Sequence, residues 1–504
     1  MRQYEHDVVV AGAGPVGLLL SIELARRGTD VCIIDSQQRP LCGSKGKGIQ
    51  PRTQELLEHI GILDEFLAIG GRYPPIRLYK SDGIREEPYA LRLEPTRDCP
   101  YPNILMVPQA QTEAILRKRL AALGRSVLVG HELTSFKQHD DGITAQLVTD
   151  SRTRMISARY LIGADGGRSV VRHLLGIPFA GETLPRRAIF ADVRANGLPV
   201  DVWHRWPDAP GGQISLCPLL GTNLFQMAAE VSPNGTVDLS VRAVVEMIRT
   251  RLSPQHIDVT EIPWYSLMRV NLRLAQRYRE RRVFLAGDAA HIHPPTGAQG
   301  LNTGVQDAFN LGWKLAAVLQ GADSSLLDSY EMERRPVAVR MLELSGVLLG
   351  AWQDQKKIER GTLTSQIDVH YRDSPLAVAL GEPKGTLRPG DRAPDAPCQD
   401  SHGREIRLFE LLRVPGFKLL GYGVASAQLA SLIQGTNAHA YSFDSPLNLV
   451  NTSFVDHHGA IQQSYGLNKD DVVLIRPDGY VAAFAGKFER EQLRTLLLHW
   501  SPLA

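Results

Sequence analysis

Cysteine pairs, excess charge and long apolar runs are all missing from this sequence. Its five cysteines form no C-x-x-C pair and have no metal-ligand spacing, so we expect free thiols and no metal site. The formal net charge is only +2, and basic residues are interspersed with acidic ones, which argues against a nucleic-acid partner. No apolar run reaches membrane-spanning length, and the chain enters an apolar strand at once. We therefore expect no membrane association, no signal peptide and a cytoplasmic location.

The remaining composition is that of a globular protein with more than one domain. Hydrophobic residues make up 43% and charged residues 22% of the chain, as is typical of soluble domains. A chain of 504 residues is too long for one ordinary core, so we expect two or three domains.

A glycine-rich turn directly follows the first predicted strand. The stretch DVVVAGAGPVGLLLSIEL, residues 7–24, holds the spacing G-x-G-x-x-G between an apolar strand and a helix. In that setting the glycines allow a tight turn, close approach of a pyrophosphate and close helix–strand packing. Asp35 ends the next strand eighteen positions after Gly17, where a carboxylate accepts from a ribose hydroxyl. The pattern predicts an adenine dinucleotide and leaves NAD and FAD open.

Two later segments also combine a strand with a polar turn. In LIGADGGRSVVR an apolar strand stops before Asp165, and Arg168 follows. In VFLAGDAAHIHPPTGAQGLNTGVQDAFNLGWKLA a strand ends at Gly287 and Asp288, and a helix is predicted from Leu301. A carboxylate at the end of a strand can accept from a sugar hydroxyl, and a helix N-terminus favours an anion.

In this order and spacing, the three motifs resemble those of the class A FAD-dependent aromatic monooxygenases, which share the p-hydroxybenzoate hydroxylase fold. The resemblance covers about the first 350 residues and implies that the bound dinucleotide is FAD. It gives Asp165 and Arg168 roles toward both FAD and the nicotinamide cofactor, although a salt bridge between the two is an equal reading of Arg168. The cofactor-binding residues within the motifs are then Gly12, Gly14, Pro15, Val16, Gly17, Asp35, Asp165, Arg168, Gly287, Asp288, Pro295, Gly300, Leu301 and Asn302.

The resemblance marks two cofactor-binding positions outside these motifs. The family has a basic residue, usually Arg, just before its second helix, and SKGKGIQPRT places Lys45 there, with Lys47 as the alternative. Lys offers a point charge where Arg offers a planar fork. The family also has a Gln in a Pro-Gln pair beside the ribityl chain, which corresponds to Gln109.

The implied activity is that of an oxidoreductase, namely an aromatic hydroxylase. NADPH or NADH would reduce FAD, oxygen would add to give a flavin C4a-hydroperoxide, and one oxygen atom would pass to a phenolic or polycyclic aromatic substrate. The absence of a second G-x-G-x-x-G and of C-x-x-C argues against flavin enzymes with two dinucleotide sites or a dithiol relay. Two alternatives stay open: a flavoenzyme of the same fold that oxidises a ketone or quinone-like compound, and, more remotely, a non-catalytic flavin-binding module.

The expected fold class is α/β, with a Rossmann-like FAD-binding domain interleaved with a β-sheet substrate domain. A C-terminal domain similar to the thioredoxin-like appendage of phenol and aromatic polyketide hydroxylases would follow. Because that region lacks C-x-x-C, we favour structural support or a homodimer contact as its role. The expected divisions are 1–71, 105–178 and 275–350 for the FAD-binding domain, 72–104 and 179–274 for the substrate domain, 351–387 for a helical linker, and 388–504 for the thioredoxin-like domain.

The substrate is expected between the flavin and the sheet of the middle domain. Inward-facing residues of the predicted strands are therefore candidate contacts, although ordinary sheet core is the more frequent role for any one of them. No catalytic residue is singled out. The candidate substrate contacts are Gln213, Ser215, Pro218, Phe225 and Met227.

Overall fold

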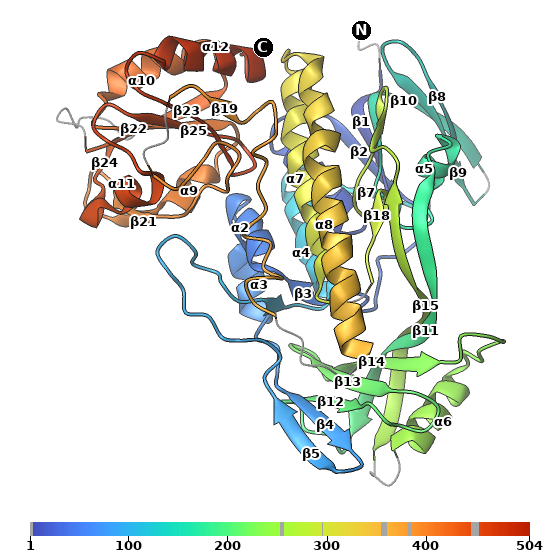
Figure 1. Cartoon of the computed structure of the whole chain (residues 1–504). Helices are drawn as coiled ribbons and strands as arrows, with labels where there is room; N and C mark the ends of the chain where they lie inside the picture. Colours follow the sequence, from blue (N-terminus) through green and yellow to red (C-terminus); the bar gives the residue numbers. More distant parts are fainter. Residues whose placement is uncertain are drawn as a thin grey trace.

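The computed structural model describes residues 4–150, 152–252, 257–294, 296–353, 360–381, 385–444 and 453–503, and it confirms the α/β class. Three mixed sheets of six to eight strands account for most of the strands. Figure 1 shows the first sheet beside two long helices, the second below it and the third beside the helix pair, at the C-terminal end of the chain. No helix within the described ranges is long and apolar enough to cross a membrane.

The first sheet carries the glycine-rich turn. Its order is β16-β17-β10-β1-β2-β7, and β1 lies parallel to both β10 and β2. Val8, Val9 and Val10 are fully buried in the parallel centre of this mixed sheet, where α1 packs on β1 and β2. The strands are β1 (His6–Ala11), β2 (Val31–Asp35), β7 (Val127–Val129), β8 (Glu132–Gln138), β9 (Ile143–Thr149), β10 (Arg152–Gly163), β16 (Arg279–Glu280) and β17 (Val283–Leu285).

Helices and two short strands surround this sheet. Helix α1 packs against α7 and α4, and α7 packs against α8. The helices are α1 (Pro15–Ala25), α2 (Pro51–His59), α3 (Leu63–Ile69), α4 (Gln109–Ala122), α5 (Val170–Leu174), α7 (Gln299–Leu319) and α8 (Asp328–Gln353), with the 3-10 turns η1 (Gly287–Ala289) and η2 (Ser324–Leu327) and the strand pair β3 (Gly48–Ile49) and β6 (Leu105–Met106).

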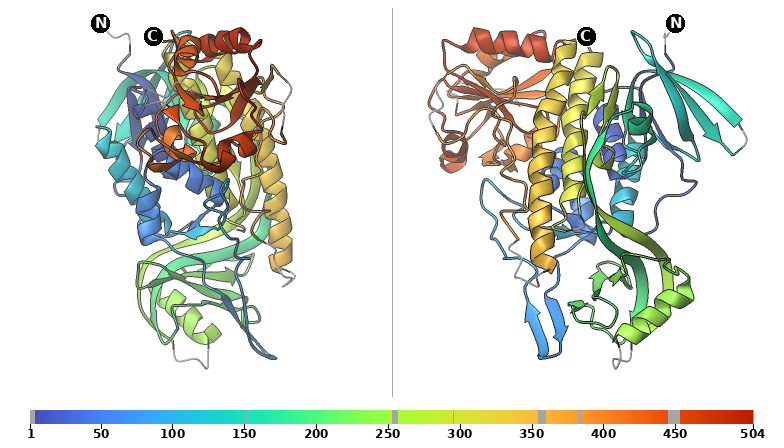
Figure 2. Two further views of the ribbon diagram at one scale, coloured as in Figure 1. Left: turned by 90° about the vertical axis from the view of Figure 1, so that its left-hand side faces the viewer. Right: turned by 45° about the vertical axis from the view of Figure 1, so that its right-hand side comes forward.

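The second sheet has the order β18-β15-β11-β14-β13-β12-β4-β5. Its two longest strands, β11 and β15, run from the first sheet down to the second as one antiparallel ribbon (Figure 2). Their pairing shifts register between Thr183 and Arg187 and again after Asp192. The elements are β4 (Ile76–Lys80), β5 (Gly83–Glu87), β11 (Phe179–Asn196), β12 (Trp203–Trp206), β13 (Ile214–Leu219), β14 (Leu224–Val231), α6 (Val241–Leu252), β15 (Asp258–Ala275) and β18 (His291–Ile292).

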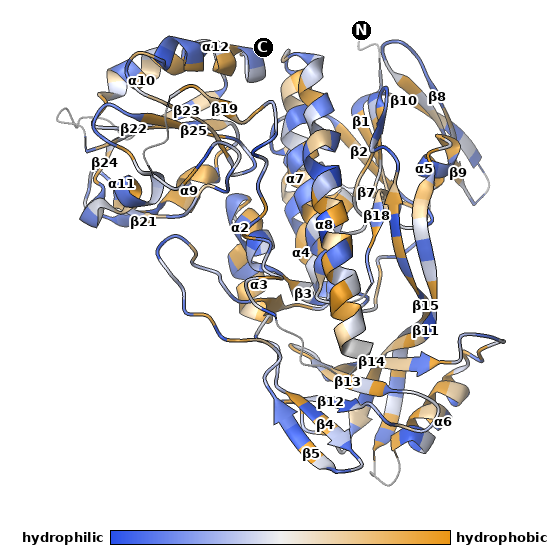
Figure 3. Ribbon diagram, viewed as in Figure 1, coloured by the Kyte–Doolittle hydropathy of each residue, from blue (hydrophilic) through white to orange (hydrophobic). Residues whose placement is uncertain are grey.

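The stretch 72–104 divides its contacts between two parts of the molecule. Strands β4 and β5 extend the second sheet, and their mainly hydrophilic colouring in Figure 3 fits the exposure of β5. Further along, the carbonyl of Asp98 accepts from the backbone N–H of Asp395, and the carbonyl of Arg97 accepts from Arg407. The later part of this stretch therefore packs on the C-terminal region rather than on the second sheet.

The third sheet has the order β19-β26-β25-β22-β23-β24, with helices on both faces. The turn RPDG, residues 476–479, joins β25 and β26 as an antiparallel hairpin. The elements are β19 (Val378–Ala379), β20 (Pro397–Gln399), β21 (Glu405–Arg407), α9 (Leu408–Leu412), β22 (Phe417–Tyr422), α10 (Ser426–Ile433), β23 (Ala438–Phe443), β24 (Ser453–Phe454), α11 (Ala460–Tyr465), β25 (Val472–Ile475), β26 (Val481–Ala485) and α12 (Arg490–Trp500).

Among the described residues of the predicted helical linker 351–387, only 351–353 are helical. Helix α8 ends at Gln353, and residues 360–377 form turns and bends. Strand β19 then pairs in parallel with β26, so this stretch already belongs to the third sheet. The sequence misleads because the helix periodicity of α8 runs up to this segment, whereas the later turns depend on packing against the third sheet.

A buried ion cluster joins the third sheet to the helix pair α7–α8. Glu333 on α8 accepts from both terminal guanidinium nitrogens of Arg476, at 2.7 and 2.8 Å, and from Lys314 Nζ on α7 at 2.7 Å. These side chains are at most 1% exposed. Buried charges persist only when they are paired in this way, so the cluster fixes how the two units meet.

Candidate functional site

A cavity of about 1810 Å³ lies between the carboxyl ends of the first sheet and one face of the second. Residues of the glycine-rich turn line one end of this cavity, and side chains of β11, β13, β14 and β15 line the other. In open parallel sheets, ligands bind outside the carboxyl ends of the strands, which is where this cavity begins.

The glycine-rich turn has the backbone that its spacing predicts. Gly12 has a φ of +102°, and a Cβ placed there would lie 2.3 Å from the carbonyl oxygen of Ala164. A Cβ on Gly17 would lie 1.9 Å from the carbonyl oxygen of Gly12, so this third glycine permits the close packing of helix on turn. Gly17 does not line the cavity, whereas Gly12, Gly14, Pro15 and Val16 do.

Asp35 lines the same end of the cavity. Its Oδ2 accepts from the backbone N–H of Ala13 at 2.7 Å, and its Oδ1 accepts from the N–H of Gln37 at 2.8 Å. These two bonds hold the carboxylate beside the glycine-rich turn. Each of its oxygens has a second lone pair that can accept a hydrogen bond from a ribose hydroxyl.

The second motif also reaches the cavity, through Asp165 and Arg168. Over the ranges that the structure describes, these two residues form no ion pair with each other, so the salt-bridge reading of Arg168 is wrong. Asp165 instead accepts from the backbone N–H of Val171, in the first turn of α5, at 3.1 Å. Its Oδ1 is buried without a partner, and burial raises the pKa of this carboxyl group.

The third motif places Asp288 and the start of α7 at the centre of the cavity. The Asp288 side chain is exposed to the cavity, and its depth below the protein surface raises its pKa. Helix α7 begins at Gln299, two residues before the predicted start, so Gly300 and Leu301 lie in its first turn and line the cavity. Pro295 lies outside the described residues.

Gly287 and Asn302, also predicted to contact the cofactor, do not line the cavity. A Cβ on Gly287 would lie 2.8 Å from Val16, so this glycine lets η1 approach the first turn. Asn302 donates to the carbonyl of Gly48 at 2.9 Å and accepts from the N–H of Gln50 at 2.8 Å. Both side chains or Cβ positions pack against the neighbouring turn and loop, so direct contact of this pair with the cofactor stays a prediction.

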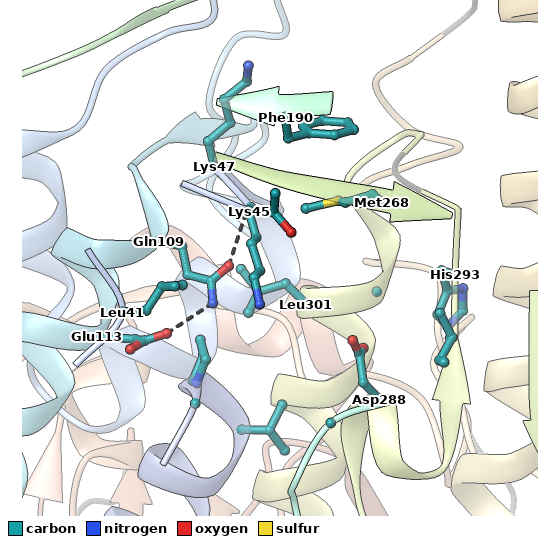
Figure 4. Close-up of a pocket in the computed structure, with 18 of the residues that line it drawn as sticks. Leu41, Lys45, Lys47, Gln109, Glu113, Phe190, Met268, Asp288, His293 and Leu301 are labelled. Carbon is teal, nitrogen blue, oxygen red and sulfur yellow. Dashed lines mark hydrogen bonds between the residues drawn. The ribbon is translucent and has the colours of Figure 1, made fainter. Parts of the chain in front are cut away.

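The loop 43–50 separates the two ends of the cavity and carries two lysines that point in opposite directions. Lys45 points toward Asp288, and Lys47 points toward the second sheet (Figure 4). Lys47 Nζ donates to Gln226 Oε1 on β14 at 2.6 Å. Of the two lysines, only Lys45 lies toward the dinucleotide end.

Gln109 holds this loop from the other side. Its backbone N–H donates to the carbonyl of Gly46 at 2.9 Å, and its side-chain Oε1 accepts from the N–H of Gly46 at 3.0 Å. Its Nε2 donates to Glu113 at 2.9 Å (Figure 4). Gln109 lines the cavity, as predicted for a residue near the cofactor, and it also fixes the loop that carries both lysines.

A buried chain of polar groups behind η1 has no counterpart in the sequence predictions. Asp307 on α7 accepts from Arg334 and from His291 Nε2, both at 2.7 Å. His291 in turn contacts His293 at 3.0 Å, and His293 lines the cavity. Burial opposes ionisation of Asp307, yet His291 and Arg334 lower its pKa, and burial lowers the pKa of His293 to about 3. The network fixes η1 relative to α7 and leaves His293 neutral.

The second sheet presents alternate side chains to the cavity. Phe190 on β11 pairs with Ala228 on β14 and Ser266 on β15, and Ala228 pairs with Ser215 on β13. All four residues line the cavity. Their neighbours along each strand face the other way, because successive side chains of a strand point to opposite faces.

This alternation corrects part of the predicted substrate contacts. Gln213 and Ser215 line the cavity. Phe225 and Met227 lie in the core on the opposite face, packed with residues of α6 such as Ile248. Pro218 is buried and does not line the cavity. For these three residues the predicted inward orientation is wrong, because Phe225 and Met227 pack with α6 and Pro218 is buried away from the cavity.

Three aromatic residues close the far end of the cavity. Tyr73 and Tyr89 stack with ring centroids 4.1 Å apart, and the Trp203 ring lies 5.7 Å from Tyr89. Tyr73 lies in the loop before β4, Tyr89 lies in the loop after β5, and Trp203 lies on β12. Only the tertiary fold brings them together. Lys47 Nζ lies 4.5 Å from the centroid of Trp203.

Comparisons with known proteins find two matching family models and relatives that are monooxygenases or hydroxylases. A family model described as "FAD binding domain" matches residues 5–345, and one described as "Aromatic-ring hydroxylase, C-terminal" matches residues 386–502. A flavin-dependent monooxygenase of Mycobacteroides abscessus is 38% identical, over 94% of this chain and 96% of its own. The 6-methylpretetramide 4-monooxygenase of Streptomyces rimosus is 32% identical, over 95% and 90% of the two chains. The crystal structure of aklavinone-11 hydroxylase with FAD and aklavinone matches with a TM-score of 0.81 and 28% identity, over 99% of both chains.

Proposed function

This chain belongs to the FAD-dependent aromatic-ring monooxygenases, and from that premise we propose that it hydroxylates a phenolic or polycyclic aromatic compound with NADPH or NADH as electron donor and O₂ as oxygen source. Family membership makes the chain an FAD-dependent enzyme that hydroxylates aromatic substrates. The kind of ring, the electron donor and the roles of individual residues are the proposal.

We assign the dinucleotide end of the cavity to FAD. The backbone around Gly14 at the N-terminus of α1 suits the pyrophosphate, and Asp35 suits the adenosine ribose. Asp288 faces the position of the ribityl chain, and the first turn of α7 offers free N–H groups to the flavin ring. The unpartnered Oδ1 of Asp165 supports this fit, since a buried acceptor without a donor points to a missing hydroxyl or amide group. When bound, FAD takes electrons from the nicotinamide and activates O₂ for transfer of one oxygen atom.

The observation that carries the proposal is the continuity of the cavity. It runs from the glycine-rich turn past the loop 43–50 to the face of the second sheet. Its volume of about 1810 Å³ exceeds the roughly 300–1,000 Å³ of an ordinary ligand pocket, so it has room for a second ligand beside FAD. Phe190, Met268 and Trp264 give this second region apolar walls that pack an aromatic ring and exclude water.

Oxidation of NADPH and of NADH by the FAD-loaded enzyme tests the proposal, with and without phenols and polycyclic phenolics. We expect one class of aromatic compound to accelerate nicotinamide oxidation and to gain one oxygen atom by mass spectrometry. The exposed variant Lys118→Met is the matched control and should behave as wild type. An oxygenated product from a ketone alone would favour the non-arene alternative. A protein that binds FAD and never consumes NADPH or NADH would contradict the proposed activity.

A further inference from the structure

Lys47 is a buried cation without a direct ion pair in the part of the chain that the structure describes. The residue is 8% exposed, its Nζ donates to the neutral amide of Gln226, and it lies over the Trp203 ring. No ion pair of Lys47 occurs within the described ranges. Burial of an ammonium group without an anion is costly, and an amide oxygen and an aromatic face recover only part of that cost.

The position of this ammonium group is fixed from the sheet side. The Gln226 side chain donates from Nε2 to the carbonyl of Ser44, which leaves its Oε1 directed at Lys47. The N–H of Ser44 in turn donates to Asp192 Oδ2 at 2.9 Å. Lys47, Gln226 and Trp203 all line the cavity, so the cation is held on the wall that the second ligand faces.

Near neutral pH the ionisable groups around Lys47 are neutral except Asp192 and Arg360, and within the described residues Asp192 forms no direct ion pair with Lys47. Burial raises the pKa of the Cys217 thiol and of the phenols of Tyr73 and Tyr89, so all three stay neutral. Burial also raises the pKa of Asp192 to about 6, although Ser44 and Lys47 oppose the shift. Among the described residues, the titratable and charged groups that face this region are Asp192 from β11, Cys217 from β13, Tyr73 from the loop before β4, Tyr89 from the loop after β5, and Arg360, which donates to the carbonyl of Tyr89.

We propose that Lys47, held by Gln226 against Trp203, is an anion subsite that binds the ionised hydroxyl group of the aromatic substrate. This inference rests on the proposed hydroxylation and names the substrate group that the cavity selects. On binding, the hydroxyl releases its proton to solvent, and the oxygen keeps the electron pair and contacts Lys47 Nζ. An ionised hydroxyl donates electron density to the ortho and para carbons of its ring, which favours attack by an electrophilic oxygen.

The test uses alizarin, a polycyclic phenol whose colour changes on ionisation, bound to the FAD-loaded enzyme. Absorbance is recorded against pH after subtraction of the flavin spectrum, and dye ionisation is compared with that in buffer. We expect the bound dye to ionise about one pH unit or more below the free dye, since an opposite charge at contact distance shifts a pKa by about 1–3 units. Lys47→Met should abolish this shift, and Lys47→Arg should retain most of it.

Lys45→Met is the matched contrast, because it removes the other lysine of the same loop. It should weaken FAD binding and leave the dye shift in the remaining holoenzyme intact. A dye that does not bind, or a shift that survives Lys47→Met with FAD retained, would overturn the anion subsite. Hydroxylated product alongside either result would leave the proposed function standing, so the two failures are distinguishable.

Discussion

Glu333→Gln tests whether the ion cluster between α8 and the third sheet holds the two units together. The carboxylate accepts from Arg476 and Lys314, and the variant replaces one acceptor oxygen by an amide N–H₂ that faces donors. The change keeps the side-chain volume, so it removes charge without opening a cavity. Arg476 and Lys314 then remain buried without the Glu333 carboxylate, and Arg476 keeps its ion pair with Asp478.

The expected loss is large because all three side chains are almost completely buried. Removal of one partner from a buried ion pair costs about 3–5 kcal/mol, compared with at most about 1 kcal/mol for an exposed pair. Burial already lowers the pKa of Lys314 to about 8, with Glu333 opposing that shift. Without Glu333, Lys314 loses its proton at lower pH and remains ionised in the unfolded chain up to its usual pKa. The unfolded variant then binds more protons than the folded variant, so the free energy of unfolding of the variant rises with pH. Its loss of stability relative to wild type therefore becomes smaller between about pH 7 and 9.

Urea unfolding of the variant and of wild type at about pH 7 and about pH 9 measures the loss of stability. Tryptophan fluorescence and far-ultraviolet circular dichroism serve as separate probes. Two probes are needed because a chain with several domains can unfold in more than one step. Glu65→Gln removes an exposed pair with Lys118 and serves as the control. A loss below about 1 kcal/mol for Glu333→Gln at pH 7, or a deficit that grows toward pH 9, would refute the reasoning.

Three further changes test the site. Gly12→Ala should abolish FAD retention after desalting, because its Cβ would clash with backbone, whereas Gly28→Ala has positive φ but open space around it and should retain FAD. Asp192→Asn should gain stability relative to wild type as pH rises from about 4 to 7, because the raised pKa of about 6 makes ionisation of the buried carboxyl unfavourable; a difference independent of pH in urea unfolding would contradict this. Asn302→Leu should cost about 2–3 kcal/mol and weaken FAD binding, because it leaves the buried carbonyl of Gly48 without its donor, and unchanged urea and FAD titrations would speak against this.

The dinucleotide end of the cavity was predictable because its requirements are local. Gly12 and Gly17 follow from backbone conformation and close packing within one strand–turn–helix unit, and Asp35 follows from the next strand. Gly287 and Asn302 show the limit of such reasoning. They belong to the motif, yet their contacts run to Val16 and to the loop 43–50, and no local pattern records those contacts.

The substrate end was less predictable because it depends on which face of each strand another element covers. Met227 and Ala228 are neighbours, and only the position of α6 decides that Met227 is core and Ala228 lines the cavity. Lys47 raises the same difficulty, since its partner Gln226 is 179 residues away. The predicted domain divisions and the role of the C-terminal region stay predictions.

The register shifts in the β11–β15 ribbon have a consequence for how the substrate range of this enzyme can change. Most cavity-lining residues of β11 lie in the regularly paired segment Arg187–Asp192, between the register shift that follows Thr183 and those that follow Asp192. Insertion or deletion of one residue within that segment would exchange its faces, turning Ile189 into the cavity and Phe190 against α6. At the shifts themselves, the irregular pairing can absorb a change in length. Divergence toward new substrates should therefore proceed by substitution at alternate positions of this segment, while length variation gathers at its two borders.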